Sequence, residues 1–488
     1  MELLQYVYIT VLNIIYKGTR YISPAIRQGI AFFSFFAMVV FLFIFYASKE
    51  FNWGLDYTQR GIVCIIFLSI STVMSVDRPL KVMKWNPVFS IPWFLCGGIA
   101  LVTSLIMDLE GYVPLSLCML VLFPCMYLVW NNRGDCEKLF DMAAKGFMVC
   151  FLLFFAICVI FYPFNELTVI SGRYQGVTGN PNTLGLVAAG AMTCGLYLIT
   201  RAKKGGWILA IFVCEIAFSL VIVSESRSAL FSIIAQMGVF LIYYVKYYIW
   251  ERDLLKSVFK LLLLAVLIIG CIPLNQALLS NSIMPMRIEI TKAVKQVAKD
   301  VKAEARIQRQ EERNKKRGIR TETAALEESQ DPVDALEQQE TPLQERFSTE
   351  GKDLNQLSSG RLALWKVYLQ ELSWKGHSSE DLIINPSTGT PMRSHNVFLE
   401  VAYHLGIPVG ILYLAVAVWA GICILKFLFS KRFYKQHPSA LFSVLAIASF
   451  CIVGMVETPI FPFEREVALF YFIGLTSLCT IRKGHRKN

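Results

Sequence analysis

The sequence predicts an all-α, polytopic membrane protein with about twelve transmembrane helices and one large extracytoplasmic loop. Of its 488 residues, 55% are hydrophobic and only 17% are charged, whereas soluble domains carry about 25% charged residues. Apolar runs of about 20 residues, the length that crosses a bilayer, recur along the chain. The short loops between these runs are basic on one side of the predicted membrane only.

The apolar runs form two groups. Nine of them predict a transmembrane bundle over residues 1–273 and three predict a second bundle over 397–488, with the extracytoplasmic loop over 274–396 between them. The runs lie near 28–48, 60–77, 89–107, 112–130, 141–162, 183–200, 206–223, 228–250, 254–273, 397–428, 439–457 and 466–482. Residues 1–16 are also apolar, but they lack the basic start and the cleavage site of a signal peptide. We expect an interfacial helix that ends at Lys17.

Lysine and arginine mark one face of the predicted membrane. They gather in the segments 17–27, 78–84, 133–145, 201–204, 246–260, 426–435 and 482–487. Because cytoplasmic loops carry the excess of basic residues, both termini are predicted to be cytoplasmic. The net charge of +11 is therefore a topology signal and does not indicate a nucleic-acid partner.

The large loop has a composition of its own. Between 274 and 394 it holds 18 basic and 18 acidic residues, so it is net neutral. Its charged insert, residues 287–345, predicts an amphipathic helix up to about Arg317 and then a disordered stretch. The 13 cysteines lie elsewhere, so neither a disulfide framework nor a cysteine-based metal site is predicted.

Glu215 is the clear acid in the middle of an apolar run. On insertion scales an acid at a helix centre costs roughly 2.5–3.5 kcal/mol unless it is paired. Two interpretations stay open, a functional site and a structural partner on a neighbouring helix.

The remaining unusual polarity lies where four predicted helices begin at the extracytoplasmic face. The clusters are Ser171–Thr183 with Arg173 and the cap Asn180, Ser224–Leu230 with Arg227, Ser358–Trp365 with Arg361 and the cap Ser358 or Ser359, and Arg393–Glu400 with His395 and the cap Ser394. Each cluster alone also fits a capped loop or an arginine that reaches toward lipid headgroups.

Together the four clusters predict an anion site. A cation at a helix N-terminus opposes the helix dipole, so four of them are costly unless an anion offsets the charge. Helix N-termini bind anions through free N–H groups, and arginine suits bidentate phosphate contacts. We therefore predict an extracytoplasmic site for a phosphate-bearing ligand, such as a lipid-linked pyrophosphate.

In this order, the motifs resemble the O-antigen ligase and O-antigen polymerase superfamily of bacterial membrane glycosyltransferases. The resemblance covers about 165–425 and is carried by Gly172, Arg173, Gly176, Asn180, Pro181 and Asn182, by Ser226, Arg227, Ser228 and Ala229, by Ser359, Gly360, Arg361 and Trp365, and by His395, Asn396, Leu399, Gly406 and Gly410. It implies a GT-C-like helical bundle in the bacterial cytoplasmic membrane with an extracytoplasmic active site.

The resemblance also implies the chemistry, an inverting, metal-independent transfer of glycan from an undecaprenyl-pyrophosphate-linked oligosaccharide to an acceptor glycan, without a cofactor. It implies that His395, Arg227 and Arg361 are catalytic. Contacts to pyrophosphate and glycan are expected from Arg173, Asn180, Asn182, Ser226, Trp365, Asn396 and Glu400. His377, Glu215 and Arg393 are further candidates, and His377 is a rival base because it stands where the family often has a glycine-rich turn. The acidic stretch 464–466 is read as solvated or arginine-paired and not as a cation site.

Three functions stay open. A polymerase would join lipid-linked repeat units into a capsular or O-antigen-like polysaccharide, with a polysaccharide flippase and a chain-length regulator as partners in the bilayer. A ligase would move the glycan to lipid A core or to a protein. A flippase or transporter would need a charged pathway and internal repeats, and neither is evident. We favour the polymerase because no acceptor-docking module is evident.

Overall fold

The computed structural model describes residues 2–51, 57–133, 137–162, 169–170, 173–203, 205–249, 254–280, 361–378, 381, 383, 393–437 and 439–480. The charged insert 287–345 and the motif residues Gly172, Ser359 and Gly360 lie outside these ranges.

The described residues up to 280 form a series of helices. They are α1 (Glu2–Thr19), α2 (Pro24–Phe51), α3 (Tyr57–Met74), α4 (Pro87–Ile106), α5 (Val113–Leu117), α6 (Phe123–Asn132), α7 (Glu137–Phe161), α8 (Pro181–Arg201), α9 (Gly206–Ser224), α10 (Arg227–Tyr243), α11 (Leu254–Gly270) and α12 (Ile272–Ser280). The two-residue strands β1 (Val169–Ile170) and β2 (Arg173–Tyr174) pair antiparallel just before α8.

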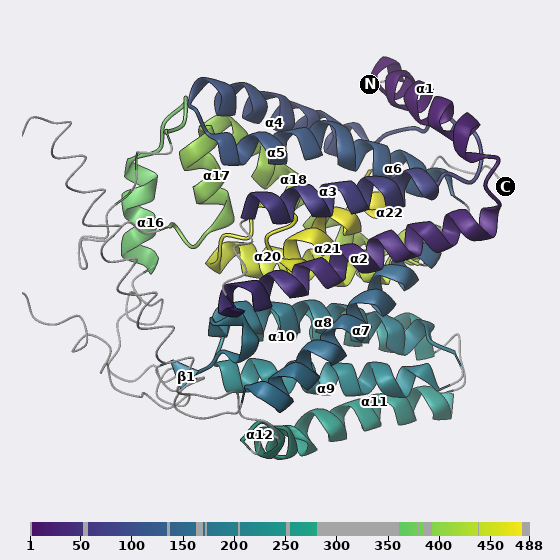
Figure 1. Ribbon diagram of the computed structural model, residues 1–488, viewed down its shortest axis with the longest axis vertical. Coiled ribbons are helices and arrows are strands. Elements are labelled where there is room, and N and C mark those ends of the chain that lie inside the picture. The colour runs from purple at the N-terminus through teal and green to yellow at the C-terminus, as the bar shows by residue number, and fades with distance from the viewer. Residues whose placement is uncertain are drawn as a thin grey trace, which may run out of the picture.

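The C-terminal part contributes α16 (Arg361–Gln370), α17 (Val397–Leu405), α18 (Ile407–Phe429), α19 (Lys431–Gln436), α20 (Leu441–Val456), α21 (Glu466–Gly474) and α22 (Thr476–Cys479). Figure 1 shows the long helices running side by side, with α1 at one end of the bundle and α16 and β1 at the other. We call these the α1 end and the α16 end.

Each of the twelve predicted runs contains helix, so the all-α prediction is confirmed for the described residues. Within the described part of the chain, eight helical stretches are long and apolar enough to cross a membrane, and α11 with α12, bent by 44°, make a ninth if the pair is one span. The predicted runs 60–77 and 439–457 form shorter apolar helices. Run 466–482 is divided between α21 and α22. The chain is therefore a multi-pass membrane protein, and twelve full spans stay a prediction.

The prediction of one unbroken helix over 397–428 is wrong. α17 ends at Leu405 and α18 begins at Ile407, because Gly406 between them has a φ of +90° that interrupts the helix. A side chain on Gly406 would also meet the Trp374 carbonyl oxygen at 2.5 Å. Only glycine combines this backbone conformation with such a close approach.

The break at Gly406 receives the segment that follows α16. The Ile407 N–H donates to the Ser373 carbonyl at 3.0 Å, and the His377 N–H donates to the His404 carbonyl at 3.2 Å. Gly376 has a φ of +83° and lies so close that a Cβ would overlap the His404 carbonyl oxygen. Two facing glycines thus fasten the described end of the large loop to the bundle.

Helix α8 is buried along almost its whole length and is flanked by α7, α9, α10, α20 and α21. Gly185 lets α10 approach it closely, since a Cβ there would lie 2.6 Å from the Ser226 Cβ and 2.8 Å from the Ala229 Cβ. Small residues commonly permit such close helix packing in membranes. This contact fixes the start of α10 beside the start of α8.

The two predicted bundles share one core. Ser232 of α10 and Ser449 of α20 are hydrogen-bonded through their hydroxyls at 2.7 Å. The Tyr46 hydroxyl of α2 donates to Glu466 of α21 at 2.7 Å. Glu466 is fully buried, so the solvated alternative for the stretch 464–466 is wrong for this residue. Glu464 lies 3.9 Å from Arg393, as the arginine-paired alternative predicted.

Helix α1 forms as predicted and ends two residues beyond Lys17. The Gln5 side chain donates to the Met83 carbonyl at 2.9 Å and accepts from the Met83 N–H at 3.0 Å. The apolar side chains of Leu3 and Tyr6 are exposed. A polar face against the protein and a free apolar face are consistent with a helix that lies in the membrane interface.

We predict that Gly376→Ala destabilises the protein more than Gly205→Ala. Both glycines have a φ near +82°, but Gly205 has open space around its Cα whereas Gly376 abuts the His404 carbonyl. Gly205→Ala therefore adds only backbone strain, about 1–2 kcal/mol, and Gly376→Ala adds a steric overlap to it. Thermal unfolding of the detergent-solubilised variants measures the difference, and equal midpoints would contradict the contact.

Candidate active site

The four predicted clusters all lie at the α16 end of the bundle. Arg173 is in β2, Arg227 is the first residue of α10, Arg361 is the first residue of α16, and His395 lies two residues before α17. Figure 1 shows β1, α16 and α17 at this same end. The prediction that Arg227 begins its helix is confirmed.

Glu457, which follows α20, joins three of these clusters. Its Oε1 lies 3.2 Å from Arg361 Nη2, and its Oε2 lies 3.5 Å from His395 Nδ1. The Ser228 hydroxyl in the first turn of α10 donates to Oε1 at 3.4 Å. One carboxylate thus gathers side chains from three segments, and we call Arg361, His395, Ser228 and Glu457 the Glu457 junction.

The Glu457 junction is half-open. The Glu457 side chain is 14% exposed, Arg361 is 22% exposed and His395 is 30% exposed. Burial raises the pKa of Glu457, but the hydrogen bond to His395 and the charges of Arg361, His395 and Arg465 outweigh burial and hold the pKa below its ordinary value. Glu457 is therefore an anion at neutral pH, with cationic and polar groups on the side that faces the α16 end.

Sequence reasoning missed Glu457. It is the C-cap of α20, where an anion opposes the helix dipole as a cation does at an N-terminus. The same dipole argument that selected arginines at helix N-termini therefore selects an acid at a helix C-terminus, and Glu457 is such an acid. An acid at the last position of the apolar run 439–457 was the available signal.

Arg173 is fixed between two other segments. Its Nε donates to the Ser224 carbonyl at 3.0 Å and its Nη2 donates to Asn182 Oδ1 at 2.6 Å. Asn180 is the N-cap of α8 as predicted, since its side chain accepts from the N–H groups of Asn182 and Thr183. Asn182 thus orients Arg173, and Asn180 sets the start of the helix that carries Asn182.

Ser226 precedes Arg227 and is the N-cap residue of α10, without a side-chain capping bond. Its hydroxyl lies 3.2 Å from the Ser228 hydroxyl. Because Arg173 holds the Ser224 carbonyl and Ser228 contacts Glu457, the turn between α9 and α10 connects Arg173 to the Glu457 junction.

His395 has a φ of +49°, a left-handed conformation that is uncommon outside glycine. The residues on both sides hold it there. Asn396 accepts from the Phe398 N–H at 3.0 Å and the Leu399 N–H at 3.1 Å. The N-cap of α17 is therefore Asn396, and the prediction that Ser394 caps this helix is wrong. Asn396 also donates to the Met455 carbonyl near the end of α20 at 3.2 Å.

Ser394 is fully buried and connects the His395 loop to its neighbours. Its N–H donates to Glu400 at 2.8 Å, and its carbonyl accepts from Trp365 Nε1 at 2.8 Å. Glu400 is buried and pairs with His404 at 3.5 Å. Trp365, Asn396 and Glu400, all predicted to bind substrate, thus hold the backbone around His395.

The three further candidates lie apart from the Glu457 junction. The His377 ring stacks on Tyr403 with centroids 4.0 Å apart, and its Nδ1 lies 2.8 Å from the Tyr403 carbonyl. Arg393 is 64% exposed and lies 3.9 Å from Glu464, a distance at which surface pairs contribute little. His395 is therefore the histidine that faces Glu457.

Glu215 has the structural partner that one interpretation predicted. It accepts hydrogen bonds from Ser219 in its own helix and from Asn275 of α12. Since a helix rises 1.5 Å per residue, Glu215 lies about 14 Å along α9 from Ser224. This arrangement favours the structural interpretation over a functional site.

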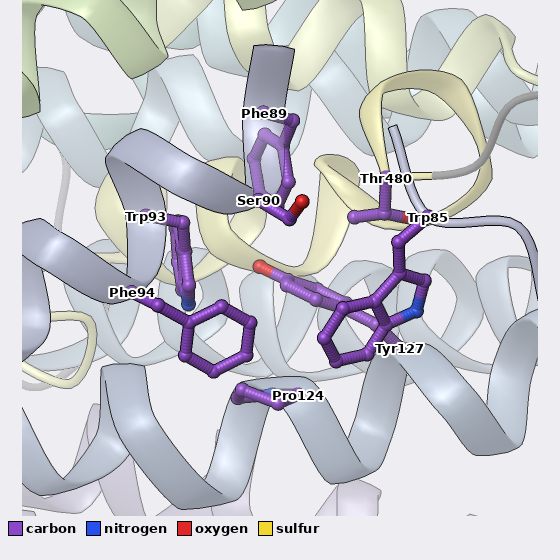
Figure 2. A pocket seen from close by; sticks show the side chains of 8 residues that line it. All are labelled: Trp85, Phe89, Ser90, Trp93, Phe94, Pro124, Tyr127 and Thr480. Atoms are coloured by element: carbon purple, nitrogen blue, oxygen red, sulfur yellow. The ribbon is translucent and has the colours of Figure 1, made fainter. Parts of the chain in front are cut away.

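A pocket near the α1 end has a different character. It is lined by Trp85, Phe89, Ser90, Trp93, Phe94, Pro124, Tyr127 and Thr480, and Figure 2 shows the aromatic rings that surround it. None of these residues belongs to the predicted clusters. The charged groups lie at the Glu457 junction and not in this aromatic pocket, so the junction is the stronger candidate for the active site.

We predict that the stabilisation contributed by Glu457 disappears in acid. Its pKa is lower in the folded protein than in the unfolded chain, so the contribution is complete above the ordinary glutamate pKa and is lost as the pH falls through the folded value. Thermal unfolding of the wild type and of Glu457→Gln, measured from pH 7 downward, should show a gap that narrows below about pH 4.3. A gap that does not change with pH would contradict the ionic pairing.

Part of the chain resembles a known protein family. Residues 210–414 match the family model described as O-antigen ligase. The match includes Arg227, Arg361 and His395, and it ends before Glu457. No curated protein matches the chain. Through residues 210–414 the chain is similar to the O-antigen ligase family, as the sequence motifs predicted.

Proposed function

We propose that the protein polymerises undecaprenyl-pyrophosphate-linked oligosaccharide repeat units at the outer face of the bacterial cytoplasmic membrane, to make a capsular or O-antigen-like polysaccharide. In this proposal both termini are cytoplasmic and the α16 end is extracytoplasmic. The observation that carries it is the Glu457 junction, where an arginine and a histidine from distant segments meet at the end of a membrane bundle.

The arginines supply the donor site. Arg173 and Arg227 flank the turn between α9 and α10, and Arg361 lies across the Glu457 junction from Ser228 at the start of α10. Guanidinium groups bind phosphate oxygens bidentately. As the bond between the anomeric carbon and the pyrophosphate breaks, negative charge develops on the leaving oxygen, and fixed cations stabilise it without reorganising. Because the α16 end lies at the membrane surface in this proposal, the lipid-linked donor can enter the site laterally from the bilayer.

His395 supplies the acceptor chemistry. With a proton on Nδ1 toward Glu457, its Nε2 is free to accept a proton from an acceptor hydroxyl. The acceptor oxygen bonds to the anomeric carbon, the electron pair of the broken bond goes to pyrophosphate, and the proton stays on His395. Attack opposite the leaving group inverts the anomeric centre. In this proposal His395 takes the proton and the arginines stabilise the leaving pyrophosphate, so the transfer is metal-independent.

A ligase that transfers the finished glycan to lipid A core or to a protein is the second candidate, since the matching family is described as O-antigen ligase. It would use the same donor site and the same base, and would differ only in the acceptor. A flippase would instead need charged groups along the membrane interior. The mid-helix acid Glu215 is hydrogen-bonded to Ser219 and Asn275 and gives little support for such a pathway.

The first test is transfer itself. We expect the full-length protein, reconstituted with undecaprenyl-pyrophosphate-linked repeat units and a metal chelator, to make a ladder of longer lipid-linked glycans, which gel electrophoresis detects. Transfer only to an added lipid A core or protein acceptor would favour the ligase. If no new glycosidic bond forms with any acceptor, both candidates are wrong.

The second test removes the clamp. Arg173→Ala and Arg227→Ala should each lower the transfer rate at least a hundredfold, because fixed donors to a developing anion typically contribute that much. Lys366→Ala is the matched control, since Lys366 is an exposed cation one turn beyond Arg361 on the same helix. Expression and unfolding midpoint are measured for each variant. A folded Arg227→Ala protein with normal activity would contradict the pyrophosphate clamp.

A further inference from the structure

In the proposed function a donor phosphate binds Arg361, and in the structure this side chain contacts the carboxylate of Glu457. Arg361 is the first residue of α16 and turns its Nη2 toward Glu457 Oε1 at 3.2 Å. Ser228, beside the proposed clamp residue Arg227, contacts the same oxygen at 3.4 Å. A carboxylate and a phosphate present similar oxygens to a guanidinium group.

Both anions cannot stay on Arg361 at once without repulsion. Glu457 is only 14% exposed, so solvent screens its charge weakly, and a pyrophosphate bound at this place would lie within contact distance of it. The carboxylate has a second partner ready, since its other oxygen already lies 3.5 Å from His395 Nδ1. Movement of roughly 0.6 Å toward His395 would make this a normal hydrogen bond.

We infer that Glu457 is a positioning residue that exchanges partners: the pyrophosphate of the donor displaces it from Arg361, and the released carboxylate then pairs fully with His395. This inference rests on the proposed function of the site. Before the donor binds, Glu457 neutralises Arg361 and shares its charge between two partners. After the donor binds, its charge stabilises the imidazolium that forms when His395 takes the acceptor proton. The exchange thus prepares the base only when a donor is present.

The inference predicts opposite effects on binding and on transfer. Glu457→Gln should bind undecaprenyl pyrophosphate about tenfold more tightly than the wild type, because the competing charge is gone, and should transfer glycan at least tenfold more slowly. Binding is measured by titration calorimetry on the full chain in nanodiscs. If Glu457 merely oriented Arg361, the same substitution would weaken binding, and that result overturns the inference.

Two controls isolate the exchange. Glu464→Gln changes an acid of similar exposure on the same connection, whose partner is the exposed Arg393, and should leave binding within twofold of the wild type. In the Arg361→Ala background, Glu457→Gln should give no gain in affinity, because the Glu457 carboxylate and the donor phosphate compete for the Arg361 side chain, which is then absent. A gain that persists without Arg361 would overturn the inference.

A measurement on the unmodified protein covers the case in which Glu457→Gln does not fold. Only five histidines occur in the chain, so the ¹⁵N resonances of His395 can be assigned with a His395→Gln variant. Undecaprenyl pyrophosphate should shift the Nδ1 resonance toward that of a stronger hydrogen bond, and an unchanged resonance in the bound protein would refute the exchange. A further outcome is that the wild type transfers no glycan while Glu457→Gln still binds undecaprenyl pyrophosphate more tightly than the wild type does. That result would reject the proposed function but support the exchange of partners by Glu457.

Discussion

The arrangement of the α16 end depends on the negative charge of Glu457. At an effective dielectric constant near 20, two unit charges about 4 Å apart interact by about 4 kcal/mol, which is large beside the net stability of a typical domain. Arg361, His395 and Ser228 all direct polar atoms to this one carboxylate. Removing one partner of a buried charge leaves the other unpaired, a loss of about 3–5 kcal/mol. The charge therefore ties α16, the loop before α17 and the start of α10 to the end of α20.

Packing makes this pairing possible. The close contact of Gly185 with Ser226 and Ala229 fixes the start of α10 beside α8, and the bond between Ser232 and Ser449 fixes α10 against α20. The loop that carries His395 is held to the end of α20 by the bond from Asn396 to the Met455 carbonyl. Uncharged contacts set these distances, so the charged groups meet without having to assemble the bundle themselves.

Local patterns predicted much of the structure. Apolar runs gave the positions of the helices, and the caps and arginines at helix starts located the α16 end of the site, as Asn180 and Arg227 illustrate. The contacts of Glu457 could not be read from the sequence, because its partners lie 62, 96 and 229 residues away and no local pattern records such pairs. The break at Gly406 was missed for a similar reason. A single glycine in an apolar run is compatible with a continuous helix, although Pro408 in the first turn of α18 also marks a helix start. The approach of Trp374 explains why the residue at the break is glycine.

The site is built against the helix dipoles at both kinds of terminus. Arg227 and Arg361 stand at helix N-termini, where anions are favoured, and Glu457 stands at a C-terminus, where cations are favoured. Arg361 and Glu457 are therefore each poorly placed in their own helix and stabilise one another across helices. A group whose stability comes from a partner and not from its own helix can change partners at lower cost. Charges arranged in this way suit a site whose anionic ligand arrives, reacts and leaves.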